Sequence, residues 1–192
     1  MVELQVSTLW AESFLFLDRR SPSLAISSKL LGLMLFGYRM EAISIMGREV
    51  IQPQGLVGLG RSSIDSCGDE IRQAFEIISN AANYGLLVHC TQGKDRTGLI
   101  IALILFLLDV PLKAVTHDYV LSEAELLPEK KERMKEINEI GLTEDFAGTP
   151  SDWAEKMLSH IREEYNTVSE YLTRIGIDSN MQATVRSNLI FE

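Results

Sequence analysis

The sequence predicts an α/β chain whose C-terminal half is rich in helices, and three observations support this prediction. Residues 86–89 form a short apolar run of the kind that makes a buried strand. A glycine-bearing loop follows, and a second apolar run at 97–108 is long enough for a buried helix, which Asp109 and Pro111 would end. From residue 112 onward the pattern favours helices almost to the last residue.

The other elements follow from periodicity and from the positions of glycine and proline. Residues 69–82 place their apolar side chains on one helical face, and residues 24–40 are helix-like. The stretch 42–51, AISIMGREVI, is compatible with a helix end or a short strand. Residues 52–63 hold one proline and three glycines and are predicted to be a loop. Five further helices are expected at 112–123, 128–140, 150–164, 167–175 and 178–190, and the charged run 129–136 is expected to be a solvated helix face.

Length and composition restrict the class of protein. A chain of 192 residues that is 46% hydrophobic is expected to form one domain with a substantial core. A net charge of −9 argues against nucleic-acid partners, which need a basic surface. Cys67 and Cys90 are too few for a disulfide framework, and the N-terminus shows no secretion signal. The longest apolar run, 99–108, has ten residues and is too short to cross a bilayer. A cytoplasmic location without stable membrane insertion is therefore expected.

Cys90 stands where the predicted strand passes into the loop 90–96, CTQGKDR. A lone cysteine beside an apolar strand is usually a core residue. At this position, however, the start of a helix follows, and its unpaired backbone N–H groups and dipole favour negative charge. Such a position lowers the pKa of a thiol and populates the nucleophilic thiolate. The sequence therefore favours a reactive sulfur at this position.

The rest of the loop suits a phosphoryl group. The N–H groups at a helix start can cradle an oxyanion, and the planar guanidinium of Arg96 can hold two phosphate oxygens. Gly93 leaves the cradle open and can adopt a positive φ, and Gly98 allows close packing of the helix start. This arrangement suits attack of sulfur on phosphorus with a covalent cysteinyl-phosphate intermediate. A metal site at His89 and Cys90 is disfavoured because no second ligand cluster is present, and no cofactor is expected.

The segment His89-Cys90-Thr91-Gln92-Gly93-Lys94-Asp95-Arg96-Thr97-Gly98 resembles the Cys-x5-Arg signature of the protein tyrosine phosphatase superfamily. Its GKDRTG ending and the segment 117–142 resemble the branch that contains lipid-active bacterial phosphatases and fungal homologues, and the likeness covers roughly residues 40–190. The resemblance implies one phosphatase-like domain over 1–192, with a divergent or truncated part at 1–60 and the catalytic loop and helical part at 61–192.

The resemblance also implies a central sheet flanked by helices on both faces. Two motifs of the branch, an Asn-Phe-Arg-Asp segment and an Arg-Ser segment, are not found in this sequence. Either strands are present in MVELQV and AISIMGREVI, or the N-terminal part has been lost and the sheet is reduced. A reduced sheet would leave an exposed edge, so a homodimer is one expectation.

Carried over residue by residue, the resemblance assigns roles within the loop. Cys90 would be the nucleophile, Arg96 the clamp for the phosphate and the transition state, and Thr97 a hydrogen-bond donor that eases departure of the sulfur. His89 would orient the loop. Substrate would be bound by Thr91, Gln92, Gly93 and Lys94, where Lys94 either adds positive charge at the rim or is simply solvated.

Three carboxylates are candidates for the acid that protonates the leaving group. Asp95 ranks first, because in this branch the aspartate of the signature is the usual acid. Asp65 ranks second and could also contact substrate, and Asp69 is more simply a helix cap. Cys67 is a candidate to form a disulfide with oxidised Cys90, although a small core residue is the favoured interpretation.

The implied function is a cysteine-dependent phosphatase that hydrolyses a phosphomonoester. Phosphotyrosine or phosphoserine/threonine in proteins (dual specificity), a phosphoinositide, and a small phosphorylated metabolite are all compatible with the residues. The alternative is a catalytically weak or inactive phosphate-binding module of the same fold.

Overall fold

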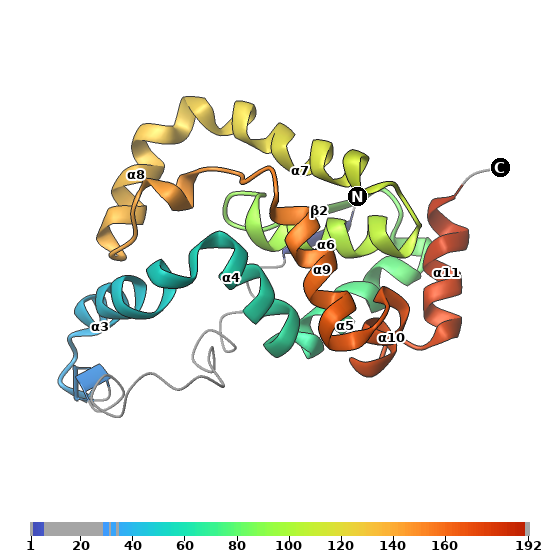
Figure 1. The fold of residues 1–192 in the computed structure, drawn as a ribbon, viewed down its shortest axis with the longest axis horizontal. Coiled ribbons are helices and arrows are strands. Elements are labelled where there is room, and N and C mark those ends of the chain that lie inside the picture. Colours follow the sequence, from blue (N-terminus) through green and yellow to red (C-terminus); the bar gives the residue numbers. More distant parts are fainter. Residues whose placement is uncertain (1, 6–28, 31, 34, 191–192) are drawn as a thin grey trace.

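The computed structural model describes residues 2–5, 29–30, 32–33 and 35–190 (Figure 1). Within these residues the strands are β1 (Val2–Gln5) and β2 (Leu86–His89). The α-helices are α3 (Arg39–Met46), α4 (Gln52–Ser66), α5 (Gly68–Ser79), α6 (Asp95–Leu107), α7 (Leu112–Leu126), α8 (Lys130–Glu139), α9 (Trp153–Tyr165), α10 (Val168–Arg174) and α11 (Ser179–Leu189). The short helical turns are a π-helical turn η2 (Gly47–Ile51) and the 3₁₀ turns η3 (Ala81–Asn83), η4 (Leu127–Glu129) and η5 (Glu144–Ala147).

The sheet seen among the described residues is a parallel pair. β1 lies beside β2, with Leu4 opposite Val88 and Gln5 opposite His89. A strand in MVELQV is therefore confirmed, whereas AISIMGREVI continues as helix through α3 and η2 and holds no strand. A larger central sheet covered by helices on both faces, as the resemblance implied, is not found in the described part of the chain, which is dominated by helices.

The expected loop at 52–63 is wrong, because these residues belong to α4. Its proline lies in the first turn, where the missing N–H does no harm. Gly55 interrupts the helical geometry with φ 63° and ψ −176°. Gly60 instead permits close packing, since a Cβ there would lie 2.7 Å from the Met157 sulfur on α9. The glycines that predicted a loop therefore have other roles: Gly55 kinks α4, and Gly60 allows α9 to pack against it.

The core is built around α6, which is apolar on all sides as expected of a fully buried helix. Leu99, Ile100 and Leu103 are at most 2% exposed. α4, α7, α10 and β2 all contact α6, and α9 lies against α4, α7 and α10. The start of α6 is therefore fixed from several directions, and the loop before it is held between two packed elements.

The predicted helices of the C-terminal half are confirmed, with ends displaced by a few residues. The predicted helix at 69–82 corresponds to α5, and the strand at 86–89 matches β2. Of the helix expected at 24–40, residues 24–28, 31 and 34 lie outside the described residues. Residues 29–30, 32–33 and 35 are helical, and a turn at 36–37 separates them from α3. Over the part of the chain that the structure describes, no helix is both long and apolar enough to cross a membrane.

Candidate active site

Cys90 lies between the end of β2 and the start of α6, so the signature forms a strand–loop–helix unit. The residue is 7% exposed. Gly93, at φ +66°, adopts the left-handed conformation that turns the loop. Gly98 lets α7 approach, because a Cβ at this position would lie 3.0 Å from the ring of Tyr119. Both glycines therefore have the conformational or packing role that the sequence suggested.

The environment of the Cys90 sulfur favours the thiolate. Burial alone raises the pKa of this thiol, but hydrogen bonds from the Thr97 hydroxyl, the Thr97 N–H and the Gln92 N–H lower it, as does the charge of Arg96. The net effect is a pKa below that of an ordinary cysteine. The Thr97 hydroxyl is buried, and no group among the described residues makes a hydrogen bond of good geometry with it, so it is available to the Cys90 thiolate, whose pKa it lowers. The sulfur is thus surrounded by donors, as a nucleophilic thiolate requires.

Two further side chains brace the loop. Arg96 is in the first turn of α6, and its Nη2 donates to Thr91 Oγ1 at 3.1 Å, so the guanidinium reaches back across the loop. The Nδ1 of His89 lies 3.2 Å from the carbonyl oxygen of Cys90. Both residues touch the loop on which the nucleophile stands, which is where their expected roles would place them.

Lys94 departs from both expectations, since its side chain is neither at the rim nor solvated. The residue is 1% exposed, and its ammonium donates to Asp95 Oδ1 at 2.6 Å. It also donates to the carbonyl oxygens of Phe146 at 3.3 Å and Gly148 at 3.0 Å. A buried ammonium is stable only when its protons are satisfied in this way. Lys94 therefore ties the loop to residues 146–149 rather than facing a substrate.

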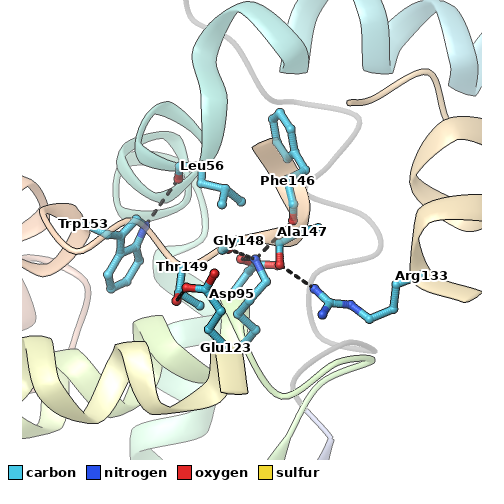
Figure 2. Close-up of polar contacts among 10 residues, drawn as sticks. Leu56, Asp95, Glu123, Arg133, Phe146, Ala147, Gly148, Thr149 and Trp153 are labelled. Atoms are coloured by element: carbon cyan, nitrogen blue, oxygen red, sulfur yellow. Dashed lines mark hydrogen bonds and ion pairs between the residues drawn. The ribbon is translucent and has the colours of Figure 1, made fainter. Parts of the chain in front are cut away.

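Residues 146–149, called the anchor segment below, are held from two other helices as well. Arg133 of α8 donates from Nη2 to the carbonyl oxygen of Ala147 at 2.9 Å, and the Thr149 hydroxyl donates to Glu123 Oε2 of α7 at 2.8 Å (Figure 2). Arg133 is only 5% exposed, so the expectation of a wholly solvated face at 129–136 is wrong at this residue. The signature loop, α7 and α8 thus meet at one short segment.

The structure brings only one of the two leading acid candidates to the loop. Asp95 lines the cavity next to Cys90, with a side chain that is 36% exposed. Asp65 points instead toward α9, where its Oδ1 accepts from His160 Nε2 and from the Tyr165 hydroxyl, each at 2.8 Å. The expected contact of Asp65 with substrate is therefore not supported. Asp69 is exposed in the first turn of α5, away from the loop.

Two adjoining cavities open at the loop. The first, named the nucleophile pocket, has a volume of about 270 Å³ and is lined by Cys90, Thr91 and Glu136. The second, the apolar pocket, has a volume of about 220 Å³ and is lined by Ile51, Leu56, Leu59, Leu142, Phe146 and Trp153. Both pockets share Gln92, Asp95, Arg96, Ile137 and Ile140. A substrate can therefore extend from the sulfur into apolar surroundings.

The apolar wall was missed by reasoning from the sequence. Ile137 and Ile140 belong to or follow α8, and Phe146 and Trp153 come from the anchor segment and α9. The available signal was the pair of isoleucines three residues apart in an otherwise charged helix, which marks one face as buried. In Figure 1, α7 and α8 run along one side of the molecule and α3 and α4 along the other, with β2 and the start of α6 between them.

The remaining candidates lie elsewhere or fit the simpler interpretation. Cys67 is 4% exposed and belongs to the hydrophobic core at the junction of α4 and α5. Among the described residues, no three histidine, cysteine, aspartate or glutamate side chains are grouped so that they could hold a metal ion.

Comparison with known proteins agrees with this geometry. The model of a family described as the tyrosine phosphatase family matches residues 48–191, which include the whole loop and both pockets. The chain belongs to this family. A tyrosine-protein phosphatase of Nostoc commune is 27% identical over 154 residues, which is 71% of this chain and 52% of the relative.

Two other relatives carry the names of different phosphatases. The triple specificity protein phosphatase PtpB of Mycobacterium tuberculosis is 27% identical over 121 residues, covering 55% of this chain and 42% of the relative. An inositol diphosphatase, DSP1, of Oryza sativa is 34% identical over 47 residues, covering 24% of this chain and 21% of the relative. The chain spans about half the length, or less, of these curated relatives.

Proposed function

We propose that this member of the tyrosine phosphatase family is a cysteine-dependent phosphatase that hydrolyses phosphomonoesters. The observation that carries the proposal is the Cys90 sulfur, whose pKa is lowered by the donors around it and which opens, with Arg96, onto the nucleophile pocket. A low-pKa thiolate beside a guanidinium and a set of loop amides is suited to phosphorus as the electrophile.

The reaction would proceed in two displacements. In the first, Arg96 and the loop N–H groups hold the phosphate oxygens while the Cys90 sulfur attacks phosphorus and the bond to the alcohol oxygen breaks. Asp95, in its protonated form, gives its proton to that oxygen. In the second, water attacks phosphorus, Asp95 accepts a proton from it, and the S–P bond breaks. The Thr97 hydroxyl then stabilises the departing thiolate.

The finer assignments rest on the sequence. We place the chain in the branch with the GKDRTG loop and fungal-type homologues, because residues 93–98 carry that ending. The relatives include a tyrosine-protein phosphatase, a triple specificity protein phosphatase and an inositol diphosphatase, so phosphorylated proteins and small phosphorylated molecules are supported as substrate classes. A phosphoinositide stays a prediction from the sequence. A cytoplasmic location and a homodimer stay predictions.

Hydrolysis of para-nitrophenyl phosphate tests the proposal. The wild type is expected to turn the compound over, and Cys90→Ser is expected to lose activity by a factor on the order of 1000 or more. Acid quench and mass spectrometry should show phosphate on Cys90 in the wild type. Cys67→Ala is the matched control, because it removes the other thiol from a core position, and it should keep the activity. Equal rates for the wild type and Cys90→Ser would refute a cysteinyl-phosphate mechanism.

A second function, phosphate binding without turnover, is favoured by one observation. Oδ1 of Asp95 is bound by the ammonium of Lys94 at 2.6 Å, so one of the two carboxyl oxygens is occupied by a structural contact. A binding module would bind vanadate or phosphate at Arg96 and would release no para-nitrophenol. The same assay therefore separates the two functions.

A further inference from the structure

The apolar pocket continues the nucleophile pocket and is of a size that holds a substantial hydrocarbon group. Its volume is about 220 Å³, whereas a cavity of about 150 Å³ lined by similar residues is enough to bind benzene. Because five residues line both pockets, an ester group attached to a phosphate over Cys90 has a direct path into it. Ile137 and Ile140 flank that path.

The wall offers little to a polar substituent. Nine of the residues that line the apolar pocket are aliphatic or aromatic, and Ser63 is the only hydroxyl-bearing side chain among its lining residues. The indole N–H of Trp153 is already used, because it donates to the carbonyl oxygen of Leu56 at 3.3 Å. A sugar or cyclitol ring in this pocket would leave several hydroxyls without partners, at a cost of about 1–3 kcal/mol each.

The charges around both pockets suit one phosphate and no more. Among the described lining residues, Arg96 is the single cation, and Asp95 and Glu136 are acidic. Lys94 and Arg133 do not line either pocket, because the Lys94 ammonium is bound to Asp95 and to the anchor segment and the Arg133 guanidinium is bound to the anchor segment. A second phosphate would therefore meet carboxylates without a compensating cation.

From this geometry we propose that the substrate is a monophosphate ester of a long aliphatic alcohol, with its phosphate over Cys90 and its hydrocarbon chain in the apolar pocket. The proposal rests on the phosphatase function above and names the substrate class of the same site. Seven of the nine apolar lining residues are branched aliphatic: Ile51, Leu56, Leu59, Leu99, Ile137, Ile140 and Leu142. A ring attached directly to the phosphate would contact mainly the shared residues, whereas a chain reaches Ile51 and Leu56 beyond them.

A series of alkyl phosphates of increasing length, each kept below its micelle concentration, tests the proposal. Each methylene that enters the pocket should raise kcat/KM by about three- to fourfold, from butyl to octyl phosphate, until the pocket is filled. The gain should appear mainly in KM, because the chain binds equally in the ground and transition states. Inositol phosphates with two or more phosphates, and a phosphotyrosine peptide, are the comparison substrates.

A pair of variants distinguishes binding of the chain in the apolar pocket from nonspecific hydrophobic binding elsewhere on the protein. Ile51→Asn places an amide in the apolar pocket and should flatten the chain-length series, measured as the ratio of kcat/KM for octyl phosphate to kcat/KM for butyl phosphate. Val57→Asn is the matched control, since Val57 is also half-buried at the start of α4 but does not line the pocket, and it should keep the series.

The outcomes are distinct for the two proposals. A flat series in the wild type, or faster turnover of an inositol bisphosphate or of the peptide than of octyl phosphate, would overturn the substrate class while para-nitrophenyl phosphate turnover still supports the phosphatase. If the wild type hydrolyses nothing, the phosphatase proposal fails. Titration of Cys90→Ser with octyl phosphate and, separately, with inorganic phosphate then tests whether the apolar pocket binds the hydrocarbon chain. At least tenfold tighter binding of octyl phosphate supports chain binding in the pocket, and equal binding of the two refutes it.

Discussion

Replacement of Lys94 by methionine should destabilise the protein by about 3 kcal/mol, although the residue belongs to a loop. Methionine keeps most of the apolar stem but removes the ammonium. Three acceptors then lose their donor: Asp95 Oδ1 and the carbonyl oxygens of Phe146 and Gly148. The change therefore separates the signature loop from the anchor segment.

The magnitude follows from the burial of the partners. Breaking a buried ion pair by removing one member costs about 3–5 kcal/mol. The Lys94 side chain is fully buried, but the Asp95 side chain is 36% exposed, so water can solvate the remaining carboxylate and the low end applies. For a chain of this length, about 3 kcal/mol corresponds to a fall in Tm of about 6–12 °C.

Urea unfolding followed by far-UV circular dichroism measures this loss, with a thermal scan as a second readout. Lys113→Met is the matched control, because Lys113 is an exposed lysine on α7 and a surface change usually alters stability by less than about 0.5 kcal/mol. If the two variants unfold at the same urea concentration, then the Lys94 ammonium does not hold the anchor segment against the signature loop.

Two further predictions concern buried hydroxyls. Thr97→Ala removes a donor to the Cys90 thiolate, so the pKa of the thiol should rise. The pH at which iodoacetamide begins to alkylate Cys90 should then move upward. An unchanged pH profile would mean that the Thr97 hydroxyl does not bond the sulfur. Tyr119→Phe removes a buried hydroxyl that has no hydrogen-bond partner among the described residues and whose pKa is raised by burial and by Asp95 and Glu123. Stability should therefore be unchanged or higher by about 1 kcal/mol in urea unfolding. Tyr171→Phe is its contrast, because that hydroxyl donates to the Ile64 carbonyl oxygen at 2.9 Å and its loss should cost about 1–3 kcal/mol; equal losses in the two variants would contradict this.

The parts of the site that sequence predicted well are those set by local signals. A short apolar run, a glycine with positive φ and an apolar helix lie within residues 86–108, so the strand–loop–helix unit is encoded by neighbours along the chain. The C-terminal helices were also predictable, because their periodicity and intervening glycines are local. Their ends shifted by a few residues where caps such as Asp178 fix the first turn.

The misplaced features depend on distant partners. The glycines of α4 resemble a turn until α9 is packed against Gly60. Lys94 resembles a rim lysine until the carbonyl oxygens of the anchor segment, more than fifty residues later, surround its ammonium. Asp65 is a reasonable acid until His160 and Tyr165 draw its carboxylate to α9. None of these contacts can be predicted from the residues that neighbour each position in the sequence.

The tie between Lys94 and the anchor segment has a consequence for the order of events at the ribosome. A nascent chain that has emerged only through α7 contains the complete signature, yet it lacks the two carbonyl oxygens, 52 and 54 residues away in sequence, that take up the lysine's protons. The Lys94 ammonium therefore gains its full set of acceptors only after Gly148 has left the exit tunnel, and a chain stalled earlier carries the motif without this tie.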